Sequence, residues 1–406
     1  MFIISFLVLQ IMSQIFALEG VVQHYAWGGT SFIPDLSNID NTNNQPFAEL
    51  WMGTHHRGPS SITREENTWD LRDYLKEYPQ ALGHHSIKKF GSKLPFLFKI
   101  LDVNTMLSIQ SHPTKKQAEI GFSKENELGI PLTAKHRNYK DDNHKPELMV
   151  ALTDFWLLHG FQSIAQIDQI VKKGIGFESL GQIWEKKSIV TLYQYIMELP
   201  QEEINQLLKP LHQVLLSKEE QLQKNQADFW ALKAFQQYTS PEGNYDRGIF
   251  SIYLFNLVFI KKGDAIFQDA GIPHAYLEGV NVEIMANSDN VFRGGLTPKH
   301  VDVSALMGNL VLSPIVPKII EAETISATEM LYPTPAPDFG LSQIHLKPGL
   351  LHQETSQSAQ ICIVMEGTVI AEEQQFSKGQ SFFIPAATNY QLSAKNETII
   401  FKAFVP

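Results

Sequence analysis

The chain has 406 residues, 43% of them apolar, a size that corresponds to about three domains and is sufficient for packed cores. Its 33 basic and 43 acidic residues give a formal net charge of -10, so nucleic acid and anionic membranes are excluded as general partners, and an anionic ligand needs a local group of cations. The single cysteine, Cys362, excludes an intrachain disulfide framework and a thiolate-rich metal site, and it is typical of a reducing compartment.

The first eleven residues are apolar but do not form a typical secretory signal. No lysine or arginine precedes Arg57, so the basic flank of a signal is missing. Polar residues such as Ser5 and Gln10 make the stretch too short and too broken to span a bilayer. We expect the natural start at Met12 and a cytoplasmic protein, with a cleaved signal or an anchor as the alternative.

Short apolar runs punctuated by Gly, Pro and Asn extend from residue 15 to about 104, a pattern typical of a β-sandwich or barrel. Helical spacing indicates one helix between Trp69 and Glu77, and the run Leu94–Leu101 indicates a buried strand. The paired histidines of this part are expected on the surface or outside any ligand shell, and we assign no chemistry to them: His55, His56, His84 and His85.

Gln110 and His112 offer two neutral metal ligands one residue apart. Side chains alternate along an extended strand, so these two point to the same side and share one wall. Alone, the pattern is weak evidence, because a polar strand end before Pro113 would look the same. Two later segments add weight: the loop that ends in Glu147 and the turn that contains His274.

The middle of the chain changes character twice. A helix is expected from Pro113, a polar loop over residues 139–147, and then two buried strands that end at Phe161. Between residues 163 and 240 leucine and isoleucine recur at spacings of three and four, which indicates a helical module. Strands resume at Leu257–Ile260, so the module is interpreted as an insertion into a β-domain.

A concealed repeat joins two distant parts of the chain. Gly263–His274 aligns without a gap on Gly379–Tyr390, and in both segments a glycine turn opens an apolar strand. Such a turn, strand and terminal histidine typically close a jelly-roll barrel of the cupin type. Because Tyr390 replaces the histidine and no Gln-x-His segment accompanies it, the second copy is expected to hold no metal.

These observations predict a mainly β protein with an α-helical insertion, built from two cupin-type jelly-roll barrels plus a helical domain. The expected domains are a discontinuous catalytic barrel over residues 12–162 and 241–321, the helical insertion over 163–240, and a C-terminal cupin-like barrel without metal over 322–406.

The ligand set proposed for the first barrel contains nitrogen and oxygen donors with one carboxylate: Gln110, His112, Glu147 and His274. Such a set suits zinc or another divalent first-row ion with one position left for substrate or water. Taken singly, Glu147 could belong to a solvated loop and His274 could be a hydrogen-bonded core residue. Together the donors favour a metal site.

A polar, glycine-rich stretch with Asp289, Arg293 and Lys299 follows the strand of His274. A guanidinium beside a metal site is suited to hold an anion or an enediolate. The alternative is a surface arginine paired with Asp289.

Three motifs now identify a resemblance: Gln-Ser-His-Pro from Gln110, Asn-His-Lys-Pro-Glu ending at Glu147, and Glu-Ile-Met-Ala-Asn-Ser-Asp-Asn-Val followed by Arg-Gly-Gly-Leu-Thr-Pro-Lys, which ends at Lys299. In this order they resemble the type I phosphomannose isomerases, from about Val21 to the C-terminus. The resemblance implies one Zn²⁺ per chain on the four ligands named above and Arg293 as a catalytic residue. It also brings His144, Lys145 and Asp289 into consideration for proton transfer.

The reaction implied is the interconversion of mannose 6-phosphate and fructose 6-phosphate through a cis-enediol, which feeds mannose and GDP-mannose metabolism. The sequence does not choose the base among the three candidates. We expect a monomer that binds a small sugar phosphate, with substrate contacts from Lys299, Lys99, Ser108 and Tyr276. Two features depart from the family pattern: the apolar lead before Met12 and the short helical module.

Two other functions stay open at this point. Two histidines and a carboxylate also resemble the ligands of an iron-dependent oxygenase, although Gln110 and Arg293 argue against it. A non-catalytic sugar-binding pair of barrels would explain the blank second copy, but the complete polar site of the first copy argues against that function.

Overall fold

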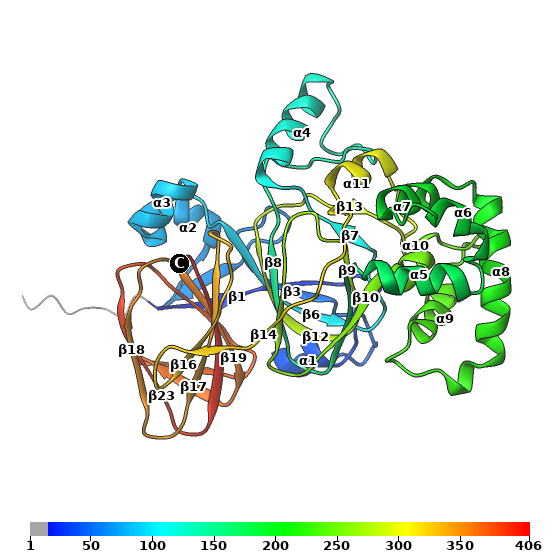
Figure 1. The fold of residues 1–406 in the computed structure, drawn as a ribbon. Coiled ribbons are helices and arrows are strands. Elements are labelled where there is room, and N and C mark those ends of the chain that lie inside the picture. Colours follow the sequence, from blue (N-terminus) through cyan, green and yellow to red (C-terminus); the bar gives the residue numbers. More distant parts are fainter. Residues whose placement is uncertain (1–14) are drawn as a thin grey trace, which may run out of the picture.

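The computed structural model describes residues 15–406, so the apolar lead over residues 1–11 and the start expected at Met12 lie outside the described residues. Within that range no helix combines the length and the apolar character needed to cross a membrane. The described chain is a mixed fold of antiparallel strands and helices, with a helical group at one end and two β-rich parts beside it (Figure 1).

The central sheet contains eleven strands and carries the functional site described below. Its longest strand, β12 (His274–Ala286), pairs with β6, β7, β8 and β9 and is buried over most of its length. The other strands of this sheet are β2 (Val21–Gln23), β3 (Glu49–Gly53), β6 (Phe96–Val103), β7 (Gln110–Ser111), β8 (Glu147–Ala151), β9 (Phe155–Phe161), β10 (Phe255–Ile260), β11 (Ala265–Gln268), β13 (Phe292–Arg293) and β14 (Ile319–Ile320).

Two further sheets are formed mainly by the C-terminal part of the chain. The sheet of nine strands contains β1 (Phe16–Glu19), β4 (Ser61–Arg64), β5 (Asn67–Asp70), β15 (Glu323–Thr324), β16 (Glu329–Tyr332), β17 (Gly340–Leu346), β19 (Gln360–Glu366), β22 (Ser381–Ile384) and β24 (Thr398–Phe404). The sheet of four contains β18 (Leu351–Thr355), β20 (Thr368–Ala371), β21 (Gln374–Ser377) and β23 (Asn389–Ala394).

The N-terminal strand belongs to the C-terminal sheet. Strand β1 pairs with β22 through Phe16 and Phe383, and with β4 on its other side. The short apolar runs that begin at residue 15 are typical of strands, but they carry no information about the partner of β1. The division of the chain at residue 322 stays a prediction, since strands from both sides of that position share this sheet.

The helices of residues 15–406 fall into three groups. Near the N-terminus are α1 (Phe32–Ser37), α2 (Leu71–Glu77) and α3 (His84–Phe90), and beside the central sheet are α4 (Lys115–Glu127) and α11 (Val303–Asn309). The third group follows β9 and contains α5 (Ile164–Lys173), α6 (Gly181–Trp184), α7 (Ile189–Glu198), α8 (Gln201–Ser217), α9 (Ala227–Tyr238) and α10 (Gly248–Leu254). Figure 1 shows this third group at one end of the molecule.

Local sequence explains where several of these helices begin. Thr114 caps α4 and Ser163 caps α5, each with a glutamine three residues later that completes a capping box. The α5–α10 group shares a core with the edge of the central sheet, because Trp230 and Phe250 of the helices belong to the same apolar cluster as Phe161 of β9. A second core joins the central sheet to the nine-stranded sheet, because Phe98 and Phe383 belong to the same apolar cluster.

Candidate active site

Three predicted metal ligands meet at the ends of their strands. His112, Glu147 and His274 are buried, and their donor atoms lie close enough together to hold one metal ion. His112 Nε2 lies 3.5 Å from Glu147 Oε1, and His274 Nε2 lies 3.3 Å from Glu147 Oε2. Both imidazoles therefore present Nε2 to the same carboxylate.

The second nitrogen of each imidazole is held by the backbone. His112 Nδ1 lies 2.7 Å from the carbonyl oxygen of Asn290, and His274 Nδ1 lies 2.9 Å from that of Ile272. A carbonyl oxygen can accept a hydrogen bond but cannot donate one, so Nδ1 carries the proton. Nε2 therefore keeps its lone pair, as metal ligation requires. His112 Nε2 is buried and has no hydrogen-bond partner among the described residues. A donor of this kind, next to a carboxylate, fits a divalent metal ion.

The electrostatics of the three groups agree with this assignment. Burial, followed by the charge of Lys145, lowers the pKa of His112 to about 4, so its ring is neutral at neutral pH. Burial opposes ionisation of Glu147, but the Lys145 ammonium, 2.7 Å from Oε1, outweighs it and holds the pKa of Glu147 well below its usual range. The carboxylate is therefore ionised.

Gln110 and Arg293 extend the site along the sheet. Gln110 is directly opposite His274 on one side and Arg293 on the other. Directly paired residues of antiparallel strands place their side chains on the same face, so the three form a row. Among residues 15–406, no carboxylate lies at ion-pair distance from Arg293, so its expected alternative, a pair with Asp289, is absent.

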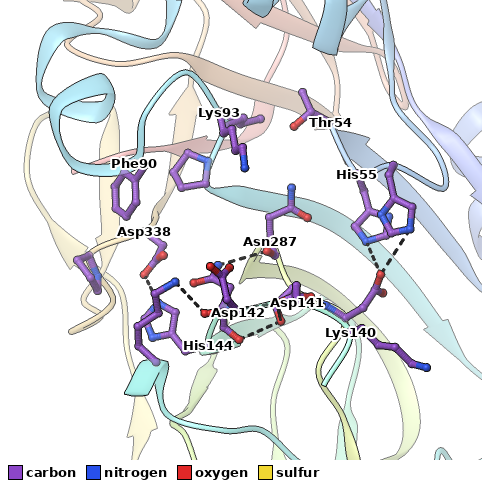
Figure 2. A pocket seen from close by; sticks show the side chains of 18 of the residues that line it. Thr54, His55, Phe90, Lys93, Lys140, Asp141, Asp142, His144, Asn287 and Asp338 are labelled. Carbon is purple, nitrogen blue, oxygen red and sulfur yellow. Dashed lines mark hydrogen bonds and ion pairs between the residues drawn. The ribbon is translucent and has the colours of Figure 1, made fainter. Parts of the chain in front are cut away.

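The loop before Glu147 is connected to the C-terminal part of the chain. His144 Nε2 lies 2.9 Å from a carboxylate oxygen of Asp338, which is buried. Figure 2 shows these two side chains at one side of a cavity of about 670 Å³, with Lys93 and Lys140 elsewhere on its wall. The other proton-transfer candidate of this loop, Lys145, points instead to the predicted metal ligands and contacts Glu147.

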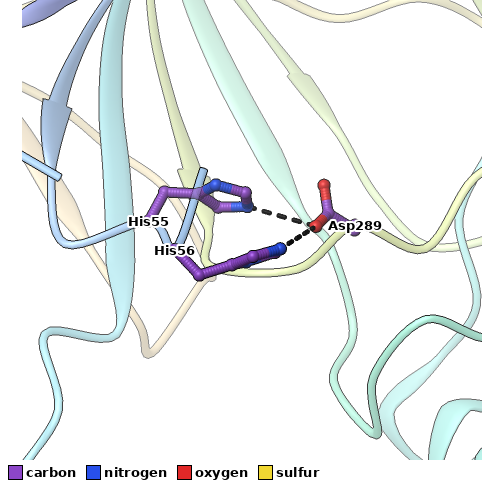
Figure 3. Close-up of side chains that lie close together, drawn as sticks. All are labelled: His55, His56 and Asp289. Atoms are coloured by element: carbon purple, nitrogen blue, oxygen red, sulfur yellow. Dashed lines mark ion pairs between the residues drawn. The ribbon is translucent and has the colours of Figure 1, made fainter. Parts of the chain in front are cut away.

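Asp289 lies at the centre of a second group of charges. Its carboxylate is 3.3 Å from His55 Nε2, 3.8 Å from His56 Nε2 and 2.7 Å from Arg57. Figure 3 shows both imidazoles directed at this carboxylate. Burial opposes ionisation of Asp289, but the hydrogen bond and charge of His55 outweigh it and lower the pKa of Asp289. His55 is 3% exposed, so of the two expected placements, on the surface or outside the ligand shell, only the second applies to it.

Two of the predicted substrate contacts, Lys99 and Tyr276, pair with buried carboxylates. Lys99 Nζ lies 3.1 Å from Glu283 and 3.4 Å from Glu49, and all three side chains are buried. The Tyr276 hydroxyl donates to Glu283 at 2.8 Å. Burial opposes the charge of Lys99, but Glu49 and Glu283 outweigh it and raise the pKa of Lys99.

The other two predicted contacts lie near Arg293. Ser108 is half-buried and directly precedes Ile109, whose amide donates to the carbonyl of Gly295. Lys299 lines a cleft of about 780 Å³ between the loop after β13 and the α5–α10 group. Burial and then the charge of Arg293 lower the pKa of Lys299, which shows that the two cations influence each other.

Sequence reasoning missed two histidines of this region. His55 contacts Asp289, and His159 is buried directly opposite His274 on the neighbouring strand. Burial lowers the pKa of His159 to about 4, so its ring is neutral. The alternation of β9 could have indicated an inward-facing His159, whereas no local pattern links residue 55 to residue 289.

Comparisons with known proteins agree on one family. A model of the phosphomannose isomerase type I catalytic domain matches residues 15–164. Mannose-6-phosphate isomerase of Salmonella typhimurium is 39% identical over 90% of this chain and 93% of its own length, and the human mannose-6-phosphate isomerase is 32% identical over 96% and 98%.

Solved structures extend this similarity to the fold. The zinc-bound holo form of a mannose 6-phosphate isomerase superposes with a TM-score of 0.85 at 34% identity, over 97% of this chain and 100% of that one. A Salmonella typhimurium structure described as bound to the substrate F6P and to zinc gives the same TM-score, identity and coverage.

Proposed function

The chain belongs to the type I mannose-6-phosphate isomerase family, and on that premise we propose how its residues share the work of the reaction. The enzyme interconverts mannose 6-phosphate and fructose 6-phosphate and depends on zinc. The observation that carries this conclusion is the buried centre of two neutral imidazoles and one carboxylate, with Arg293 in the same row of side chains.

Zinc is held by Gln110, His112, Glu147 and His274. The unpartnered Nε2 of His112 and the shared carboxylate support the last three, and the direct pairing of Gln110 with His274 supports the first. When bound, zinc would act as a Lewis acid that polarises the sugar carbonyl and orients its oxygens. The backbone carbonyls at Nδ1 fix the tautomer of both imidazoles before the ion binds.

Arg293 stabilises the enediolate. Isomerisation moves a proton between C2 and C1 of the sugar, and negative charge develops on oxygen as the cis-enediol forms. A guanidinium that lacks a carboxylate partner is free to act on this charge, and its strand pairing fixes its distance from the ligands. Lys299 shares the field of Arg293 and lines an adjoining cleft, which supports it as a contact for the sugar phosphate.

The candidates for proton transfer are His144, Lys145 and Asp289. Each of them lies at ion-pair distance from an ionisable side chain. Lys145 contacts Glu147, His144 contacts Asp338, and Asp289 contacts His55. A general base must reach the C1 and C2 hydrogens. Lys145 is the one of the three that directly contacts a proposed metal ligand, which supports it as the first variant to examine.

We also propose the two-barrel cupin architecture with the domain limits given above. The recurrence of a glycine turn before β11 and before β22 supports it, since both strands enter their sheets at the same point of the repeat. A cytoplasmic monomer stays a prediction.

A coupled assay of purified protein on mannose 6-phosphate tests the function. We expect activity that is lost with a chelator, restored by zinc and equal in the presence and absence of oxygen. Oxygen consumption with bound iron would favour the oxygenase, and sugar-phosphate binding without turnover in the zinc-loaded protein would favour a binding protein.

A further inference from the structure

The C-terminal sheets contain a buried polar cluster that no part of the isomerase reaction uses. Glu329 on β16, His352 and Glu354 on β18, and Lys402 on β24 meet in the interior of this part of the molecule. The donor atoms of Glu329, His352 and Glu354 lie within 4.8 Å of one another, which is close enough for one ion. We call these four residues the Lys402 cluster.

An ammonium group occupies the centre of the cluster. Lys402 Nζ lies 2.8 Å from Glu329 Oε1 and 2.5 Å from Glu354 Oε2, and Lys402 is 3% exposed. His352 Nε2 lies 3.4 Å from the same oxygen of Glu354, while its Nδ1 is 3.0 Å from the hydroxyl of Thr328. Two carboxylates therefore bind one cation, and an imidazole whose other nitrogen is bonded to Thr328 contacts one of these carboxylates.

Strand register places this cluster at the position of the metal centre. In the central sheet His274 ends the glycine-opened repeat and is directly opposite Gln110. In the C-terminal sheets Tyr390 ends the second copy of that repeat and is directly opposite Glu354. The Tyr390 hydroxyl donates to Glu354 at 2.8 Å, so the side chains of this second pair also meet.

A second pair of positions corresponds in the same way. Glu147 is opposite Gln268, five residues after the first glycine of the repeat, and Gln360 is opposite Ile384, five residues after the second. Gln360 is within 2.9 Å of the Tyr390 hydroxyl. Glu354 of the Lys402 cluster and the neighbouring Gln360 thus occupy strand positions that correspond to Gln110 and Glu147.

We propose that the Lys402 cluster is a second metal-type site in which the lysine ammonium takes the place of a divalent cation, and that removal of this ammonium exposes a site for Zn²⁺ or Co²⁺ on Glu329, His352 and Glu354. The proposal does not depend on the isomerase reaction. A buried carboxylate, Glu329, and a partly buried one, Glu354, need a nearby positive charge, and either an ammonium or a metal ion supplies it. The donor set of one imidazole and two carboxylates suits first-row divalent ions.

The expectation of a metal-free C-terminal part rests on a wrong reason. It was based on the replacement of histidine by Tyr390 and on the missing Gln-x-His segment, whereas Glu354 and Gln360 both accept hydrogen bonds from the Tyr390 hydroxyl. The signal was present in His352-Gln-Glu354, which has the same alternation as Gln110-Ser-His112.

The test replaces Lys402 with methionine, which removes the charge and keeps most of the volume. The wild type and Lys402→Met are each incubated with excess Zn²⁺, passed through a desalting column and analysed for metal per chain. We expect Lys402→Met to hold one more ion than the wild type, with isomerase activity retained as evidence of the fold. A melting temperature that rises with added Zn²⁺ in the variant alone would support the same site.

The double variant Lys402→Met/His352→Ala is the matched control and should lose the additional ion. A folded Lys402→Met that binds no more metal than the wild type, or a double variant that keeps the extra ion, would overturn the proposal. If Lys402→Met folds only with Zn²⁺ present, the ion has replaced the lysine and the proposal is supported. If Lys402→Met folds neither with nor without Zn²⁺, the experiment is repeated with Lys402→Gln, which can still donate to the carboxylates. A folded Lys402→Gln without an additional ion overturns the proposal.

Discussion

Each ligand imidazole is fixed at Nδ1 by a backbone carbonyl, so its contribution to the site lies in Nε2 alone. His274 Nε2 lies 3.3 Å from the Glu147 carboxylate, and His274 is directly opposite Gln110. Loss of a residue that only orients a ligand typically costs about 10- to 100-fold in metal affinity, so loss of a ligand should cost about 100-fold or more.

We therefore expect His274→Ala to lose zinc and isomerase activity together. Metal analysis after dialysis against buffer without zinc measures the first, and the coupled assay measures the second. His212→Ala, which removes a half-buried histidine bonded to Tyr245 in the helical group, is the control and should keep its zinc. Full zinc content in His274→Ala would refute the ligand assignment.

The role proposed for Arg293 differs from that of the ligands, because a partner of the enediolate is needed only while the reaction proceeds. Removal of one preorganised partner of a developing oxyanion typically lowers kcat by about 100- to 1,000-fold. We expect Arg293→Ala to show a fall of this order with little change in KM and with zinc retained. Steady-state kinetics and metal content of one preparation measure all three quantities.

Arg64→Ala, on strand β4, provides a control for the loss of an arginine elsewhere and should leave kcat unchanged. A large rise in KM at near-normal kcat would show that Arg293 clamps the phosphate of the ground state. That outcome would transfer the enediolate role to another cation.

The residues of the site differ in how far sequence could identify them. Gln110, His112 and Glu147 lie in short motifs whose chemistry is local, so their types and spacing were informative. The contact of His55 with Asp289 joins strand ends that are remote in sequence, and no periodicity encodes it. The role of Lys99 as a substrate contact stays a prediction, and the sequence did not indicate that two buried carboxylates, Glu49 and Glu283, pair with its ammonium.

At the scale of elements, strand β13 is the part that positions Arg293, and glycine makes its close approach to α10 possible. Gly295 has a φ of 121°, and a Cβ there would lie 2.5 Å from Gly248 Cα. Both the positive φ and the lack of space mean that a residue with a side chain fits at position 295 only if the backbone moves. The loop after β13 would have to shift away from the helix, and Arg293, two residues before, would move with it.

We expect Gly295→Ala to reduce kcat by about tenfold or more while zinc stays bound, since an error of about 1 Å in a positioned group can cost 100-fold. Kinetics with metal analysis measure this effect. Gly308→Ala is the matched control, because a Cβ at Gly308 in α11 meets nothing within 4 Å. Unchanged kinetics in Gly295→Ala would mean that β13 tolerates the shift.

At the scale of the whole molecule, pairing between distant strands was the least predictable feature. The sequence indicated β6, β8 and β9 from their apolar runs, because burial on both faces leaves a local signature, and it also indicated β10, which is only partly buried. It could not indicate that β1 pairs with β22, since partner choice depends on the joint packing of Phe16 and Phe383 in a shared core. The repeat indicated that the two glycine turns are equivalent. It did not indicate that the residues of the Lys402 cluster meet.

The contact between His144 and Asp338 makes the active-site loop depend on the C-terminal part of the chain. His144 stands two residues before Pro146 and three before Glu147, so the position of its ring affects the approach of the loop to the metal ligands. Asp338 is 2% exposed, and its carboxylate accepts a hydrogen bond of 2.9 Å from His144 Nε2. A bond to a charged group contributes about 1.5–3 kcal/mol, roughly twice the value for neutral partners.

Asp338→Asn keeps the size of the side chain and removes its charge, so about half of that energy is lost. Since 1.4 kcal/mol corresponds to a factor of ten, we expect kcat/KM to fall by about three- to twelvefold, with zinc content unchanged. Lys262→Met is the matched control, because it removes an exposed ion pair with Glu366 that also joins the central and C-terminal sheets. Exposed pairs contribute little, so this control should retain its activity.

Equal activity of Asp338→Asn and the wild type would show that the loop holds its geometry without help from the C-terminal sheets. A fall in both variants would instead assign the effect to the contact between the sheets as a whole.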